Sequence, residues 1–121
     1  MDGPEINERA FRFACRIVDL YRKMRKAGGP AWELAPQLLN AGTSIGANLE
    51  EATGGQSKPD FISKNCIALK ESRETRYWLR LIDATKMLPD ENVKPDIQEA
   101  TEFVAILRTI ITNARLSLRA K

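Results

Sequence analysis

Apolar residues recur every three or four positions along most of the chain, and no strict two-residue alternation is present. This spacing is typical of helices that bury one face. The first helical pattern covers about residues 6–27 and ends at Gly28-Gly29-Pro30, because glycine adopts the left-handed conformation that ends helices and proline cannot continue them. The second begins near Pro36, since a missing amide proton costs little in a first turn, and it reaches about residue 53.

The second half of the chain contains two longer helical patterns. Ser57 is a suitable N-cap for a helix over about residues 58–88, with Asp60 in the first turn, where the helix dipole favours an acid. A turn at Pro89 separates it from a last helix over about residues 93–119. Four long helices with short connections predict an all-α, up-down-up-down antiparallel four-helix bundle. At 121 residues the chain is one domain by size.

The third predicted helix is apolar on two sides. One stripe faces the expected core, and the other lies nearly opposite it. A helix that is apolar on two sides usually has a partner on each, and an exposed second stripe would leave an apolar patch that is large for a monomer. We therefore predict a homo-oligomer whose interface uses the second stripe, made of Ile62, Cys66, Leu69, Tyr77 and Leu81.

Charged and polar residues also lie inside the second and third helical patterns. Because buried charges persist only when they are paired and hydrogen-bonded, we predict a structural polar network that fixes helix register. Its predicted members are Asn48, Glu71, Glu74 and Arg76. The carboxylates also suggest a di-metal site, but bundles that hold two metals normally add histidine ligands, and this chain has no histidine. We therefore predict no metal.

The residues that usually carry catalysis or hold a cofactor are scarce. Without histidine, serine and cysteine lack their usual general base, so we predict no catalytic residue. Cys15 and Cys66 fall inside helical patterns and are expected to be small, buried hydrophobic residues. Residues 54–57 could hold an anion on free amides or simply form a turn and a cap, and they lack the Gly-Lys-Ser/Thr of a phosphate loop. No cofactor is predicted.

Basic residues are unevenly distributed, although the net charge is only +3. They are concentrated in residues 9–26 and from residue 108 onward, whereas residues 90–102 are acidic. In an up-down bundle, the start of the first helix and the end of the fourth lie at the same end. These groups could be solvated helix faces, or they could form a basic surface for RNA or DNA. The predicted nucleic-acid contacts are Arg9, Arg12, Arg16, Arg115, Arg119 and Lys121.

Two aromatic residues, Tyr77 and Trp78, lie beside Arg76 and Arg80. Such residues stack on bases in single-strand binders, but at helical spacing they are more often packing residues. No apolar run approaches the roughly 20 residues that cross a bilayer, and the N-terminus lacks a secretory signal, so we expect a cytoplasmic protein with no membrane association.

One long run of residues resembles the four-helix-bundle family named for 23S rRNA intervening sequences. The resemblance covers about residues 11–111. It is densest in Gln37-Leu38-Leu39, Gly42-Thr43-Ser44-Ile45-Gly46-Ala47-Asn48-Leu49-Glu50-Glu51-Ala52, Gly54-Gly55-Gln56-Ser57, Asp60-Phe61-Ile62 and Lys70-Glu71-Ser72-Arg73-Glu74-Thr75-Arg76-Tyr77-Trp78-Leu79-Arg80-Leu81. Several members carry a basic pair where this chain has Leu39 and Asn40.

This resemblance implies a left-handed antiparallel bundle that assembles into rings, commonly of five protomers. A distant branch is similar to the accessory protein of diversity-generating retroelements, a basic ring that works with a reverse transcriptase and RNA. That likeness is at the level of the fold and adds only modestly to the nucleic-acid hypothesis. Two functions are therefore expected: a non-catalytic homo-oligomeric scaffold that binds RNA or DNA, or an adaptor for an unidentified protein partner with no nucleic-acid role.

Overall fold

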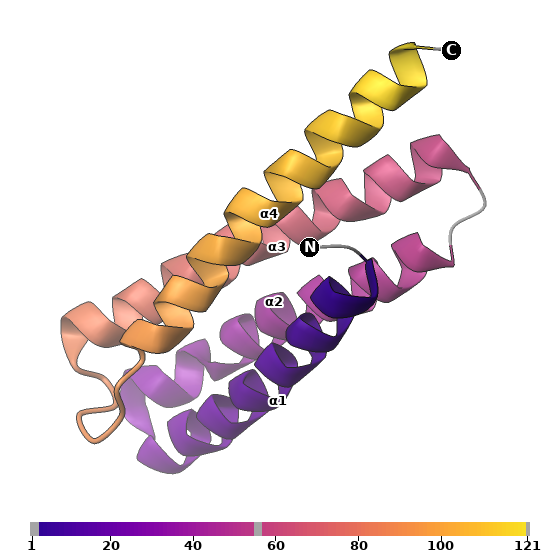
Figure 1. Cartoon of the computed structure of the whole chain (residues 1–121). Coiled ribbons are helices and arrows are strands. Elements are labelled where there is room, and N and C mark those ends of the chain that lie inside the picture. The colour runs from indigo at the N-terminus through magenta and orange to yellow at the C-terminus, as the bar shows by residue number, and fades with distance from the viewer. Residues whose placement is uncertain (1–2, 55–56, 121) are drawn as a thin grey trace.

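Four long helices make up almost all of the computed structural model, which describes residues 3–54 and 57–120 (Figure 1). They run alternately up and down, and each packs against the next helix in the chain. The all-α four-helix bundle is therefore confirmed. The helices are α1 (Gly3–Ala27), α2 (Gly29–Thr53), α3 (Lys58–Thr85) and α4 (Lys94–Arg119).

The junction between α1 and α2 is a single residue, and α2 begins earlier than the predicted start near Pro36. Gly28 and Gly29 both have positive φ angles, 74° and 57°, which turn the chain without a loop. Pro36 lies inside α2, so it cannot donate to the carbonyl oxygen of Trp32, four residues before it. Arg25 Nη1 donates to that oxygen at 3.5 Å, and its guanidinium lies 3.4 Å from the centre of the Trp32 ring.

Both ends of α3 are defined by local chemistry. The Ser57 side chain accepts a hydrogen bond from the backbone N–H of Asp60 at 3.2 Å, which confirms the predicted cap. At the other end, Lys86 adopts a left-handed conformation with φ of 53° and ends the helix three residues before the predicted position 88.

The seam between α1 and α2 is closely packed around small residues. Ile17 is fully buried, and a Cβ atom added to Gly42 would lie only 2.6 Å from its Cγ1 atom. One turn further along α2, a Cβ atom on Gly46 would make an ordinary 3.5 Å contact with Ala10. The thin profile of α2 at these glycines therefore lets α1 approach it closely.

The seam between α1 and α4 is different, because long charged side chains span it. Arg9 on α1 lies opposite Glu99 and Glu102, in the N-terminal half of α4. At 1.5 Å of rise per residue, the 17 residues of α4 after Glu102 extend about 25 Å, whereas the six residues of α1 before Arg9 extend only about 9 Å. The C-terminal end of α4 therefore extends beyond the start of α1 (Figure 1).

Candidate functional site

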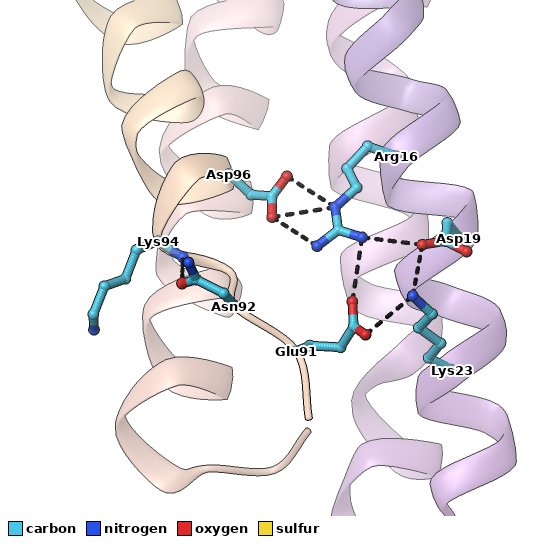
Figure 2. A network of polar contacts seen from close by, with 7 residues as sticks. All are labelled: Arg16, Asp19, Lys23, Glu91, Asn92, Lys94 and Asp96. Carbon is cyan, nitrogen blue, oxygen red and sulfur yellow. Dashed lines mark hydrogen bonds and ion pairs between the residues drawn. The ribbon is translucent and has the colours of Figure 1, made fainter. Parts of the chain in front are cut away.

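An ion-pair cluster centred on Arg16 joins α1 to the start of α4 (Figure 2). The guanidinium makes a two-pronged contact with Asp96, at 3.1 Å from Nε to Oδ1 and 3.1 Å from Nη2 to Oδ2. Its third nitrogen, Nη1, donates to Asp19 at 3.0 Å and to Glu91 at 3.3 Å. Hydrogen bonding to Asp96 raises the pKa of Arg16, although burial opposes the shift. Asp96 is only 7% exposed, so this pairing holds a buried carboxylate in place.

Lys23 extends the cluster along α1. Its ammonium lies 3.1 Å from Glu91 Oε2 and 3.1 Å from Asp19 Oδ2. Hydrogen bonding to Glu91, and then to Asp19, raises the pKa of Lys23, and the bond from Lys23 lowers the pKa of Asp19. Two cations and three carboxylates are therefore paired with one another within this part of the seam.

A second ion-pair cluster lies nearer the start of α1. Arg9 donates to both oxygens of Glu99, at 2.7 and 2.6 Å, and also contacts Glu102. Hydrogen bonding to Glu99 raises the pKa of Arg9, burial opposes that rise, and bonding to Glu102 adds to it. The same guanidinium lies 5.5 Å from the centre of the buried Phe103 ring. Arg9 and Arg16 are therefore already satisfied within the chain, so neither offers a free cation to a nucleic acid.

The remaining predicted nucleic-acid contacts do not form one patch with Arg9. Arg12 is exposed and lies 3.6 Å from Glu8 on its own helix. Arg115 lies 13 residues beyond Glu102 on α4, or about 20 Å along the helix axis. Arg119 lies further still, and Lys121 falls outside the described residues. The expected convergence fails because α4 extends past the start of α1.

Instead, six arginines lie along the outer surface of the α3–α4 pair, and we call this surface the arginine face. Arg73 and Arg80 follow Cys66 at seven-residue steps, so all three share one side of α3. Arg115 of α4 donates to Cys66 Sγ at 3.6 Å, which places the α4 arginines beside that side. The face comprises Arg73, Arg76 and Arg80 from α3 and Arg108, Arg115 and Arg119 from α4.

The arginine face differs from the α1–α4 seam in its charge balance. Within residues 3–54 and 57–120, none of its six arginines forms an ion pair. Five of the six are exposed, and Arg76 is half-buried. No acidic residue occurs after Glu102, so α4 supplies no carboxylate to neutralise them. Two features of the sequence indicate this face: α4 has no acid after Glu102, and Arg73, Arg76 and Arg80 follow one another on α3 at steps of three and four residues.

In the part of the chain that the structure describes, no ion pair joins the members of the predicted polar network. Asn48 donates to the backbone carbonyl of Ser44 at 2.8 Å, within its own helix. Burial, followed by the negative charge of Glu74, raises the pKa of Glu71. None of Glu71, Glu74 and Arg76 has an ion-pair partner among the described residues. The polar network of this bundle is instead the one between α1 and α4.

The predicted oligomer stripe is partly covered within the single chain. Ile62, Cys66, Leu69 and Leu81 are half-buried, and Leu69 packs against the core. Cys15 on α1 is exposed, so the expectation that both cysteines are buried is wrong for this residue. Tyr77 is 56% exposed, and its ring meets the Trp78 ring edge-on, with the ring centres 5.1 Å apart. Beside it lies a shallow hollow of about 300 Å³, lined by Tyr77, Arg80, Leu81, Asp83 and Ala84. The hollow therefore lies where the predicted stripe, through Tyr77 and Leu81, meets the arginine face at Arg80.

Two kinds of feature are not found among the described residues. No group of three or more histidine, cysteine or acidic side chains is arranged to hold a metal ion. Within the same ranges, no helix combines the length and apolar character needed to cross a membrane. The anion site suggested for residues 54–57 falls partly on residues 55 and 56, which lie outside the described ranges.

Comparison with known proteins places the chain in a family. A crystal structure of a protein of unknown function from the S23 ribosomal protein family of Bacteroides thetaiotaomicron is 38% identical, with a TM-score of 0.82, and the match covers 93% of this chain and 99% of that one. No curated protein matches the chain. The model of the family described as 23S rRNA-intervening sequence protein matches residues 4–109. Neither match indicates an enzyme family. The chain therefore belongs to the 23S rRNA-intervening sequence protein family.

Proposed function

We propose that the protein is a non-catalytic, self-associating helical scaffold that binds RNA or DNA through the arginine face. The observation that carries this proposal is the contrast in arginine pairing. On the α1–α4 seam, Arg9 and Arg16 are each held by carboxylates, whereas the arginine face has six arginines and no ion pair among the described residues. Clustered guanidiniums repel one another unless an anion approaches, and phosphate accepts two parallel hydrogen bonds from a guanidinium.

The dimensions of the arginine face suit a phosphate backbone. The α3 side, from Cys66 to Arg80, spans 14 residues and therefore about 21 Å. Arg115 lies beside Cys66 and Arg119 lies beyond it, so the six arginines extend over at least this length. They could contact several successive phosphates without reading bases, because backbone contacts carry no sequence information directly. We therefore expect binding that depends strongly on salt and weakly on sequence.

Self-association is supported by exposed apolar side chains. Phe11 and Leu116 are 62% and 56% exposed, and neither belongs to the core. A homo-oligomer would cover some of this surface and repeat the arginine face around the assembly, so several weak contacts would act together. Native mass spectrometry in dilute solution is expected to show an oligomer, with a pentamer as the expected size. Monomer alone at micromolar concentration would contradict this part of the proposal.

Fluorescence anisotropy with a labelled oligonucleotide tests the nucleic-acid part. Affinity should fall linearly on a log–log salt plot, with a slope of about −0.7 for each single-strand phosphate contacted. The triple variant Arg73/Arg80/Arg108→Gln should bind more weakly and show a shallower slope. A matched control, Arg12/Arg22/Lys26→Gln, removes three exposed charges from α1 and should bind like the wild type.

The second candidate function is an adaptor for another protein. The observation that favours it is the apolar surface at the end of α4, where Leu116 and Leu118 are 56% and 42% exposed. The two candidates give different outcomes. If no oligonucleotide binds at low salt, or if the Arg73/Arg80/Arg108→Gln variant binds unchanged, the adaptor becomes the better explanation.

A further inference from the structure

The hollow beside Tyr77 has the chemistry of a binding site for one planar, polar ring. Its volume of about 300 Å³ is at the small end of the range of ligand sites. Tyr77, Leu81 and Ala84 line the hollow, so an aromatic ring, a branched aliphatic side chain and a methyl group supply its apolar surface. A small aromatic ligand could therefore contact carbon on more than one side.

The Tyr77 ring is well placed to stack on such a ligand. Its edge-on contact with Trp78, at an interplanar angle of 76°, fixes one side of the ring, while 56% of the residue remains exposed. Arg73 precedes it by four residues and Arg80 follows it by three, so both guanidiniums lie on the same side of α3. A base stacked on Tyr77 would therefore have a cation on each side for its flanking phosphates.

Polar groups of both signs also line the hollow. Asp83 presents a carboxylate there, which Lys94 Nζ holds at 2.9 Å from Oδ2 and 3.2 Å from Oδ1. A carboxylate accepts hydrogen bonds from the exocyclic amino groups of bases, as from cytosine N4. Arg80 contributes a donor for phosphate or for a carbonyl oxygen of the base.

We infer that this hollow receives one unpaired nucleobase, stacked on Tyr77, and that the nucleic acid bound by the arginine face is single-stranded. The inference rests on the proposed function and specifies its ligand. In a duplex the bases are stacked on each other and paired, so none is free to reach Tyr77. Single strands offer every base as a stacking surface, which is why aromatic side chains beside a basic track favour them.

The test compares three labelled probes of equal length and matched sequence: a single strand, its duplex, and a single strand with abasic sugars in place of its bases. The wild-type protein should bind the single strand more tightly than the other two. Tyr77→Ala should weaken single-strand binding by roughly 5- to 150-fold, the range set by loss of one base–aromatic stack, and leave abasic binding unchanged. Tyr77→Phe keeps the ring and should restore most of the affinity.

An intrinsic optical signal provides a second measurement. The chain has two tryptophans, so in a Trp32→Phe background Trp78 is the only one, with its ring centre 5.1 Å from that of Tyr77. Its fluorescence should change when the single strand binds and stay constant with the abasic strand. This readout uses the native Tyr77, so it holds even if the alanine variant folds poorly.

The outcomes separate this inference from the proposed function. Equal affinity for single strand, duplex and abasic strand, together with an unaffected Tyr77→Ala variant, would overturn the inference while the Arg73/Arg80/Arg108→Gln variant still tests the arginine face. Absence of binding to all three probes at low salt would overturn the proposed function itself.

Discussion

The α1–α4 seam and the arginine face use the same side chain in opposite ways. On the seam, Arg16 holds Asp96 in a two-pronged contact, and Arg9 does the same for Glu99. On the arginine face, Arg73 and its five companions form no ion pair within the described ranges. The arginines of the seam join α1 to α4 through carboxylates. The arginines of the face are not balanced by a carboxylate among the described residues and can attract an anion. The net charge is only +3 because acidic residues of the chain offset its basic ones. Several of those acids are paired on the α1–α4 seam and do not neutralise the arginine face.

The largest expected effect breaks the seam. Arg16→Ala leaves the buried Asp96 without its guanidinium, and an unpaired buried carboxylate is costly. Because the Arg16 side chain is 30% exposed and water can partly replace it, we expect a loss of about 2–3 kcal/mol in the free energy of unfolding. Urea unfolding followed by circular dichroism measures it.

The control comes from the other surface. Arg73→Ala removes an exposed arginine that has no ion-pair partner among the described residues, so the free energy of unfolding should stay within about 0.5 kcal/mol of wild type. Equal losses for Arg16→Ala and Arg73→Ala would show that pairing does not distinguish the two surfaces.

The rigidity of the charged α1–α4 seam can be tested at Gly42, on the opposite side of α1. Gly42→Ala places a Cβ atom 2.6 Å from Ile17 Cγ1, so α1 must shift or Ile17 must repack. If the pairs to α4 hold α1 firmly, this overpacking should cost about 1–3 kcal/mol. Gly46→Ala makes only an ordinary 3.5 Å contact and should be neutral or stabilising by up to about 1 kcal/mol, since alanine favours helices.

Thermal unfolding of the two glycine variants distinguishes the cases. A Gly42→Ala protein as stable as Gly46→Ala would show that α1 moves freely between α2 and α4. The ion pairs of the seam would then adjust to a shift of α1 without holding it in place. The seam and the arginine face would differ only in whether their arginines are paired with carboxylates.

Much of the fold could be predicted because local patterns determine it. Ser57 caps α3 with its own side chain, and apolar spacing marks each buried face. The start of α2 is marked by Pro30 in its first turn, and Pro36 lies inside the helix, where Arg25 donates to the carbonyl group that this proline leaves without a backbone donor. That contact depends on how α1 and α2 cross, which no local pattern records.

The site was harder to predict because charges pair across distant positions. Arg16 and Asp96 are 80 residues apart, and Arg9 and Glu99 are 90 apart. The basic start and the acidic 90–102 segment were visible in the sequence, but their pairing depends on the register of α1 against α4. Without that register, Arg9 and Arg16 were predicted as free cations. The arginines of α3 and α4 form no ion pair among the described residues, and the absence of an acid after Glu102 leaves the C-terminal part of α4 with no carboxylate to offer them.

The pH dependence of two acidic residues sharpens the comparison further. Hydrogen bonds from Gln98 and then Arg9 lower the pKa of Glu102 on the seam, so its contribution is present above its ordinary pKa and is lost as the pH falls through the lowered value. Burial raises the pKa of Glu71, so the charged carboxylate destabilises the folded state at a pH above this raised pKa. The destabilisation disappears as the pH falls below the ordinary pKa of glutamate, because the carboxyl group is then protonated in both the folded and the unfolded state.

Urea midpoints at about pH 7 and about pH 3 measure these two effects. Glu102→Gln should lower the midpoint at the higher pH, whereas Glu71→Gln should raise it. Both differences should shrink at the lower pH, where the carboxyl groups become protonated. Shifts of the same sign for the two variants at about pH 7 would contradict the assignment of Glu102 to a stabilising pair and Glu71 to an unfavourable site.

The smallest expected effect concerns repulsion within the arginine face. Arg76 lies three residues after Arg73 and four before Arg80, and like charges at these spacings destabilise a helix by about 0.2–0.5 kcal/mol per pair. Arg76→Gln keeps most of the side-chain stem and removes both pairs, so it should raise the free energy of unfolding by a few tenths of a kcal/mol at low salt. Salt at about 1 M shortens the screening length to about 3 Å and should abolish the gain.

Arg12→Gln, which breaks the exposed pair with Glu8, should change stability in the opposite direction. A loss for Arg76→Gln at low salt would mean that this guanidinium has a stabilising partner, and the arginine face would then resemble the seam.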